Sequence, residues 1–241
     1  MEKYASVMDL ASAEITVELE EELGLNEIWD MEDEPWFQNG KFLEAIIALL
    51  KDKPNVAKRW ISSMSKISSE FTSSFVEDTN LEIWGDLGVD IDEILNLYFR
   101  RDGGSQLAMQ YVNDALYLGC PLDEDFPEWL TLNYFLKFVP MKYVISECRY
   151  GFDYFIECYL KAGGDFCKLA EKFINEVGYS DNFEDFDAMA YMISIDSSMF
   201  DLVAFANGVD CDQLSGKYER EWYYCVLQGA GLDSTHLKKF A

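Results

Sequence analysis

Basic residues are scarce in this sequence. Its 241 residues include 19 lysines and arginines, and the longest basic runs are pairs such as Arg100-Arg101 and Lys238-Lys239. Proteins that bind DNA, RNA or anionic membranes use clustered Lys and Arg side chains to displace counterions. The sequence therefore argues against direct binding to nucleic acid and against binding to a membrane surface.

Histidine is almost absent, which limits the chemistry that the chain can perform. Its single histidine is His236. A Ser-His-Asp or Cys-His nucleophile would have to use that residue. The chain also lacks a Gly-x-Ser-x-Gly elbow and a Gly-x-x-x-x-Gly-Lys-Ser/Thr phosphate loop. We therefore expect that this protein is not an enzyme.

Cys-x-x-Cys pairs and long apolar runs are absent as well. Without thiolate pairs at metal-ligand spacing, we expect no metal, no cofactor and no disulfide framework. No apolar run approaches the roughly 20 residues that cross a bilayer, and no apolar signal segment opens the chain. We expect a cytoplasmic protein with reduced, mostly buried thiols at the six cysteines, Cys120, Cys148, Cys158, Cys167, Cys211 and Cys225.

Acidic residues, by contrast, are present in large excess. Asp and Glu number 45, which gives a net charge of −26, while 15% of the residues are aromatic. So many aromatics exclude a disordered acidic chain. Solubility needs a net charge of only about 2–8, and further charge opposes the compact state. The excess therefore favours a basic protein as partner, although a halophilic source or an acidic surface without a role stays open.

Apolar residues recur every three or four positions along most of the chain. This spacing predicts a mainly α protein built of multi-helix modules. A small β component stays open over Lys142–Tyr159, where β-branched and aromatic residues are frequent. Helices are expected within residues 11–25, at 41–50, from Pro54, across 62–74, and over 90–101, 105–118, 126–139, 141–160, 165–177, 185–193, 197–206 and 218–227.

Glycines and polar turns suggest how the helices are grouped. We expect an acidic N-terminal helical module over residues 1–85 and a helical domain over residues 86–241. Within that domain, Gly103-Gly104 and Gly163-Gly164 each precede similar segments. This similarity predicts a degenerate internal repeat, with related modules over about 103–160 and 163–241.

Acidic pairs also permit a catalytic alternative. Asp90 and Asp92, or the run Asp123 to Asp125, could hold Mg²⁺ or supply the acid and base of a hydrolase. Such pairs arise by chance in so acidic a chain, and acids near a helix start are favoured by the helix dipole. A calcium loop at Asp210–Glu221 is rejected because its fifth position is Leu214.

The densest acidic segments are the predicted partner-binding site. Carboxylates spaced along helices can present a charge density like that of duplex DNA, which carries one negative charge per about 1.7 Å. The candidate residues are Glu18, Glu20, Glu21, Glu22, Glu32, Asp33, Glu34, Asp123, Glu124, Asp125, Asp181, Glu184, Asp185 and Asp187.

One stretch of about thirty residues combines a helix, an acidic turn and an Asn-Tyr pair. Its residues are Leu107-Ala108, Tyr111-Val112, Pro121-Leu122-Asp123-Glu124, Pro127 and Asn133-Tyr134-Phe135. This stretch resembles the ArdA-type antirestriction proteins, which belong to the acidic DNA-mimic inhibitors of phages and mobile elements. The Tyr-Gly-Arg-Asp element of that family is absent, and Arg149-Tyr150-Gly151 contains only some of its residues in another order.

The resemblance and the charge together predict an inhibitor that mimics nucleic acid in the host cytoplasm. Its partner would be a basic nucleic-acid-binding protein of the restriction or CRISPR type, which would make the chain an antirestriction or anti-CRISPR protein. The alternative is an immunity protein that neutralises a basic toxin or nuclease. Monomer and homodimer both stay open.

Overall fold

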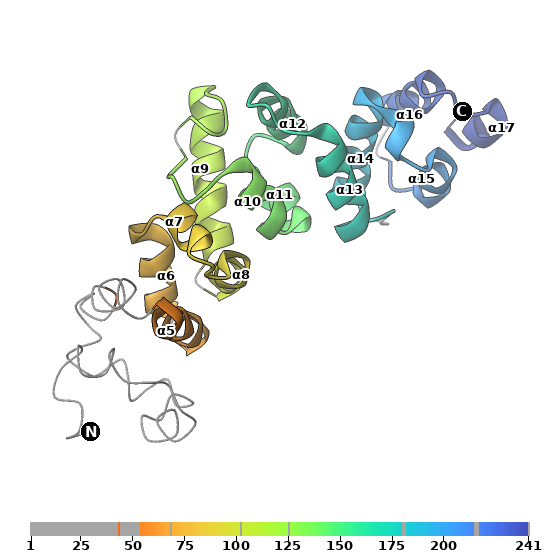
Figure 1. Ribbon diagram of the computed structural model, residues 1–241. Coiled ribbons are helices and arrows are strands. Elements are labelled where there is room, and N and C mark those ends of the chain that lie inside the picture. The colour runs from red at the N-terminus through yellow and green to blue at the C-terminus, as the bar shows by residue number, and fades with distance from the viewer. Residues whose placement is uncertain are drawn as a thin grey trace. The chain divides into compact units, whose positions relative to one another are not determined.

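The computed structural model describes residues 43, 54–67, 69–101, 103–124, 126–179, 182–214 and 217–240. Over these residues the protein consists of α-helices with two short 3-10 helices and no strand (Figure 1). The predicted mainly α, multi-helix fold is therefore confirmed, and the described residues do not contain the small β component that stayed open. Lys142–Tyr159, where a strand stayed open, is helical apart from one turn. None of the described helices has both the length and the apolar character needed to cross a bilayer.

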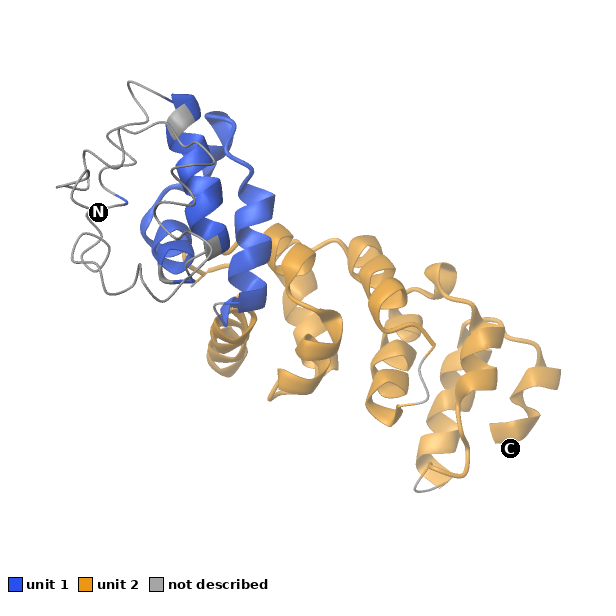
Figure 2. Ribbon diagram, turned by 90° about the horizontal axis from the view of Figure 1, so that it is seen from below, with its two compact units in different colours: residues 1–104 blue, residues 105–241 orange. Residues whose placement is uncertain are grey.

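The chain divides into two compact units, Met1–Gly104 and Ser105–Ala241 (Figure 2). The division falls at Gly104 and not at the boundary expected between residues 85 and 86. The reason is that α8 (Ile91–Arg101) packs against the helices before it, α5 (Pro54–Ile67), α6 (Ser69–Asp78) and α7 (Leu81–Asp86). Trp60 and Phe75 are fully buried in this first unit.

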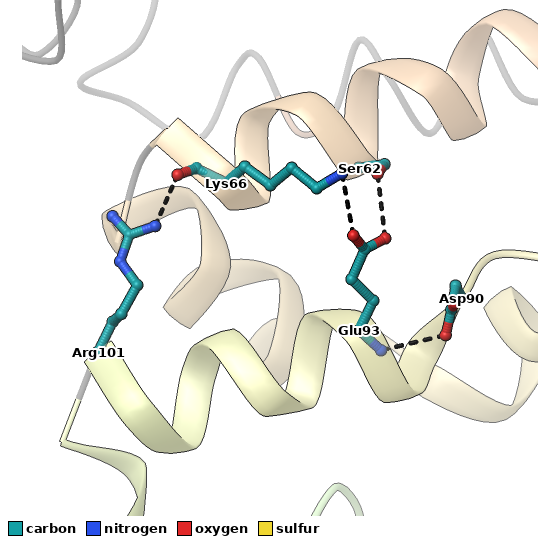
Figure 3. Close-up of polar contacts among 5 residues, drawn as sticks. All are labelled: Ser62, Lys66, Asp90, Glu93 and Arg101. Atoms are coloured by element: carbon teal, nitrogen blue, oxygen red, sulfur yellow. Dashed lines mark hydrogen bonds and ion pairs between the residues drawn. The ribbon is translucent and has the colours of Figure 1, made fainter. Parts of the chain in front are cut away.

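Polar contacts fix α8 against α5 in the first unit (Figure 3). The Glu93 carboxylate forms an ion pair of 2.9 Å with Lys66 and accepts a hydrogen bond of 3.3 Å from the Ser62 hydroxyl. Arg101 donates to the backbone carbonyl of Lys66 at 2.6 Å. Asp90 accepts a hydrogen bond from the backbone N–H of Glu93 at 3.1 Å. Asp90, considered above as a metal ligand, therefore serves to begin α8.

The second unit is a succession of short helices. Nine α-helices span its described residues, with the 3-10 helices η1 (Ser197–Met199) and η2 (Lys238–Phe240). The α-helices are α9 (Gly104–Leu118), α10 (Leu132–Phe138), α11 (Met141–Glu147), α12 (Phe152–Lys161), α13 (Phe166–Glu176), α14 (Phe183–Ile195), α15 (Leu202–Gly208), α16 (Lys217–Gly229) and α17 (Ser234–Leu237).

Helices of the second unit pack on the helix two places further along the chain. α11 contacts α13, α12 contacts α14, α14 contacts α16, and α15 contacts α17. The first residues of α12, α14 and α16 are 31 and 34 positions apart, which lies within the repeat length of stacked helical-repeat proteins. Contacts of α11 with α13 and of α12 with α14 cross the boundary expected between modules 103–160 and 163–241, as contacts between neighbouring repeats do.

Three predicted helices of this unit have clearly different bounds. The helix expected over 197–206 is the 3-10 helix η1 followed by α15, which begins only at Leu202. The helix expected over 141–160 is two helices, because Cys148 to Gly151 form a turn and Gly151 has φ 92°. The helix expected over 126–139 begins only at Leu132, where the Thr131 side chain accepts from the backbone N–H of Tyr134 at 3.2 Å. A glycine with positive φ and a side-chain cap override the apolar spacing at these points.

The similarity around the two glycine pairs has a physical explanation. Gly103 and Gly163 have φ of 72° and 85°, and each follows a helix. At Gly104 a Cβ atom would lie 2.5 Å from the Tyr98 ring, and at Gly164 it would lie 2.3 Å from the Tyr159 ring. Both segments therefore end a helix in the same way, with a tyrosine ring packed where only glycine fits.

The six cysteines form no disulfide. Only Cys148 and Cys158 are buried, while Cys120 and Cys211 are partly exposed and Cys167 and Cys225 are exposed. The expectation of mostly buried thiols is therefore only partly met.

Candidate partner-binding site

Nine of the fourteen predicted carboxylates lie outside the described residues. They are Glu18, Glu20, Glu21, Glu22, Glu32, Asp33, Glu34, Asp125 and Asp181. The structure places the remaining five, Asp123, Glu124, Glu184, Asp185 and Asp187, in the second unit.

Four of these five carboxylates are exposed. Asp123 and Glu124 lie in the turn between α9 and α10, and Glu184 and Asp187 lie on α14. None of the four forms an ion pair within the described part of the chain. Asp185 is different: only 7% of its surface is exposed, because it lies on the inner side of α14. Asp185 is therefore not part of an acidic surface, contrary to the prediction.

Glu184 and Asp187 line a pocket of about 360 Å³ in the second unit. Residues of α12, α14 and α16 line the pocket, together with Ile145 of α11 and Gly151 in the turn before α12. Asp153 of α12 contributes a third carboxylate, and Phe183 of α14 and Trp222 of α16 contribute aromatic walls. No Lys or Arg is among the described residues that line it.

Helix starts explain why carboxylates gather here. Asp153 lies in the first turn of α12 and Glu184 in the first turn of α14. Negative charge in the first turn is favoured by the helix dipole, and Asn182 caps α14 by accepting from the backbone N–H of Glu184 at 2.9 Å. Because α12 packs on α14, two acidic helix starts are brought to one place.

The pocket is lined by carboxylates, and no described Lys or Arg of the lining neutralises their negative charge. Burial raises the pKa of the Asp187 carboxyl above its ordinary value, and the nearby Asp153 and Glu219 carboxylates raise it further. Asp187 still reaches solvent at the mouth of the pocket, but the pocket walls displace part of its hydration. The charged form of Asp187 is therefore destabilised by its surroundings.

Two tyrosines, Tyr191 and Tyr223, also have raised pKa values, for which burial is the largest cause. Burial is the largest cause of the raised pKa of Tyr191, followed by its hydrogen bond of 3.1 Å to the Glu157 carboxylate. Burial also raises the pKa of Tyr223, with contributions from Asp187 and Glu219. The Tyr223 hydroxyl is buried and has no hydrogen-bond partner among the described residues.

Gly151 allows Asp153 to approach the turn before α12. Its φ of 92° and ψ of 146° belong to a region that side-chain-bearing residues rarely adopt. A Cβ atom at this position would lie 2.5 Å from the Asp153 carboxylate. The turn therefore requires glycine for two independent reasons.

Sequence reasoning missed Asp153, Phe183 and Trp222, which complete the pocket. Asp153 is one of many isolated acids, and nothing in the sequence places it beside α14. One signal was available, because Asp153 follows two residues after Gly151, a glycine with positive φ, and lies in the first turn of α12. No cluster of three side chains suited to a metal ion occurs within the described ranges.

No family model, no curated protein and no solved structure matches this chain. The resemblance to the ArdA-type proteins therefore stays a prediction.

Proposed function

We propose that this protein is an acidic inhibitor that mimics nucleic acid and blocks a DNA- or RNA-binding defence protein of the restriction or CRISPR type. The observation that carries the proposal is the net charge of −26. The exposed carboxylates at Asp123, Glu124, Glu184 and Asp187 contribute to it, and no described ion pair neutralises them. Such a surface is complementary to a groove built for phosphates.

The stacked helix pairs of the second unit support a protein-binding role. In helical-repeat proteins, this architecture presents extended surfaces to a partner. Complementary charge would steer the two proteins together and make their association fast, and added salt would weaken it. The partner would be a basic nucleic-acid-binding protein in the cytoplasm of the host cell.

The proposal is tested by capturing partners from host lysate on the tagged full chain. A captured nucleic-acid-binding protein should be released by excess duplex, and its own binding to labelled duplex should fall as the acidic protein is added. Charge reversal at Asp123 and Glu124, or at Glu184 and Asp187, should weaken that inhibition. A captured protein that binds its nucleic acid equally well with and without the acidic protein contradicts the proposal.

A second function, an immunity protein that neutralises one basic toxin, is favoured by the pocket. Mimicry of a phosphate backbone needs only a surface of charges, whereas a pocket with aromatic walls can select one side chain of one partner. An immunity protein would abolish the activity of its cognate toxin, would ignore other nucleic-acid-binding proteins, and would keep its partner in the presence of excess duplex.

A further inference from the structure

We propose that the pocket between α12, α14 and α16 receives a single cationic side chain, an arginine in preference to a lysine, from the basic partner. This inference rests on the proposed function, because it names the group that the acidic surface recognises.

The pocket concentrates negative charge without a matching cation. Asp153, Glu184 and Asp187 line it, and none of them has a described Lys or Arg as partner. The Asp153 carboxylate acts on Asp187 and raises the pKa of the Asp187 carboxyl, as expected for like charges near one another. A cation placed among them would remove this repulsion, so its binding gains energy that a neutral group would not gain.

Aromatic surface lies beside these carboxylates. Phe183 and Trp222 are 38% and 37% exposed, so both rings present surface at the wall of the cavity. The Trp222 ring packs edge-on against the buried Tyr223, with ring centroids 5.0 Å apart, so α16 fixes its position. A cation over an aromatic face is attracted by the negative charge of that face.

Size and geometry select the occupant. A pocket of about 360 Å³ is large enough for one long side chain and far too small for a helix or a duplex. A guanidinium group is planar, donates five N–H groups in a fork that matches carboxylates, and stacks on aromatic rings. A lysine ammonium supplies the charge but neither the fork nor the flat face.

The binding test uses three capped peptides, acetyl-Gly-X-Gly-amide, in which X is arginine, lysine or citrulline. Citrulline has nearly the shape of arginine but no charge. Each peptide is titrated at low ionic strength into the full chain, and the indole N–H signals of the tryptophans are followed by NMR. We expect arginine to bind more tightly than lysine, and citrulline to bind at least tenfold more weakly than arginine. Equal binding of arginine and citrulline overturns the inference.

Matched variants test the location of the site. Glu184→Gln with Asp187→Asn removes two charges from the pocket, and Asp123→Asn with Glu124→Gln removes two charges from the α9–α10 turn. We expect the pocket variant to lose arginine binding at least tenfold, while the turn variant loses less than twofold. Equal losses in both variants would mean that only net charge matters, and would overturn the inference.

The aromatic wall is tested on the same helix. Trp222→Ala removes the wall, whereas Tyr218→Ala removes an exposed aromatic that does not line the pocket. Arginine binding should fall only in Trp222→Ala, and an equal fall in both variants counts against the pocket. If the peptide tests fail while a basic partner is still captured and inhibited, the pocket assignment is wrong and the proposed function stands.

Discussion

At the scale of single residues, Asp187 links the pocket to the pH dependence of stability. Its pKa is raised in the folded protein, first by burial and then by Asp153 and Glu219. Between its ordinary pKa, about 3.9, and the raised value, the folded state binds more protons than the unfolded state. Stability from this group is therefore present at low pH and is lost as pH rises through the raised pKa.

Asp187→Asn should accordingly raise the free energy of unfolding above that pKa. The gain should shrink as pH falls and disappear below the ordinary pKa of aspartate, because the wild-type carboxyl is then neutral in both states. Urea-induced unfolding measured across the acidic pH range checks this. Asp123→Asn is the control, since it removes the same charge from an exposed turn. An equal, pH-independent gain in both variants would contradict the assignment to the pocket.

Gly151 lines the pocket and has a positive φ, which residues with a side chain rarely adopt. Gly151→Ala should lower the free energy of unfolding by about 1–3 kcal/mol, because alanine at φ 92° is strained and its Cβ would meet Asp153. The control is Gly229→Ala at the end of α16, where nothing lies within 4 Å of the added Cβ. That change should be neutral or stabilising by up to about 1 kcal/mol. Similar losses at the two glycines, measured by thermal unfolding, would refute the argument.

At the scale of helices, side-chain caps decide where several elements begin. The Asp165 carboxylate accepts from the backbone N–H groups of Cys167 at 2.9 Å and Lys168 at 3.3 Å, and α13 starts at the next residue, Phe166. Asp165→Ala should cost about 1 kcal/mol in urea-induced unfolding. Asp165→Asn should keep most of that stability because its amide oxygen accepts the same bonds. If both variants lose equally, the charge of Asp165 and not its capping stabilises α13.

The sequence predicted the helices well wherever local spacing decides the structure. α8 has the expected buried face, with Ile91, Ile94, Leu95 and Tyr98 all buried. The prediction from apolar spacing was wrong where a turn interrupts an apolar stretch, as between α11 and α12. Of the residues in that turn, Cys148 to Gly151, only the glycine is less compatible with a helix than its neighbours. The break lies at Gly151, whose φ is 92°, and α11 packs on α13 and α14.

The candidate site was predicted in part for a related reason. Glu184 and Asp187 were expected because they lie in a dense acidic segment of the sequence. Asp153 and Trp222, about thirty residues away on either side, reach the same pocket only through the packing of α12 and α16 on α14. Composition identifies the charge of a surface, but helix packing decides which charges face one cavity.

At the scale of the whole molecule, self-repulsion should make stability depend on salt. The net charge of −26 opposes the compact state, and the screening length falls from about 30 Å at 0.01 M salt to about 8 Å at 0.15 M. Raising NaCl over this range should therefore raise the melting temperature, by about 2–4 °C for each kcal/mol of repulsion relieved. KCl and choline chloride at equal ionic strength should act alike, because screening depends on ionic strength and not on the cation. A melting temperature that stays constant or falls in all three salts would mean that the acidic side chains are too well solvated to repel one another in the folded protein.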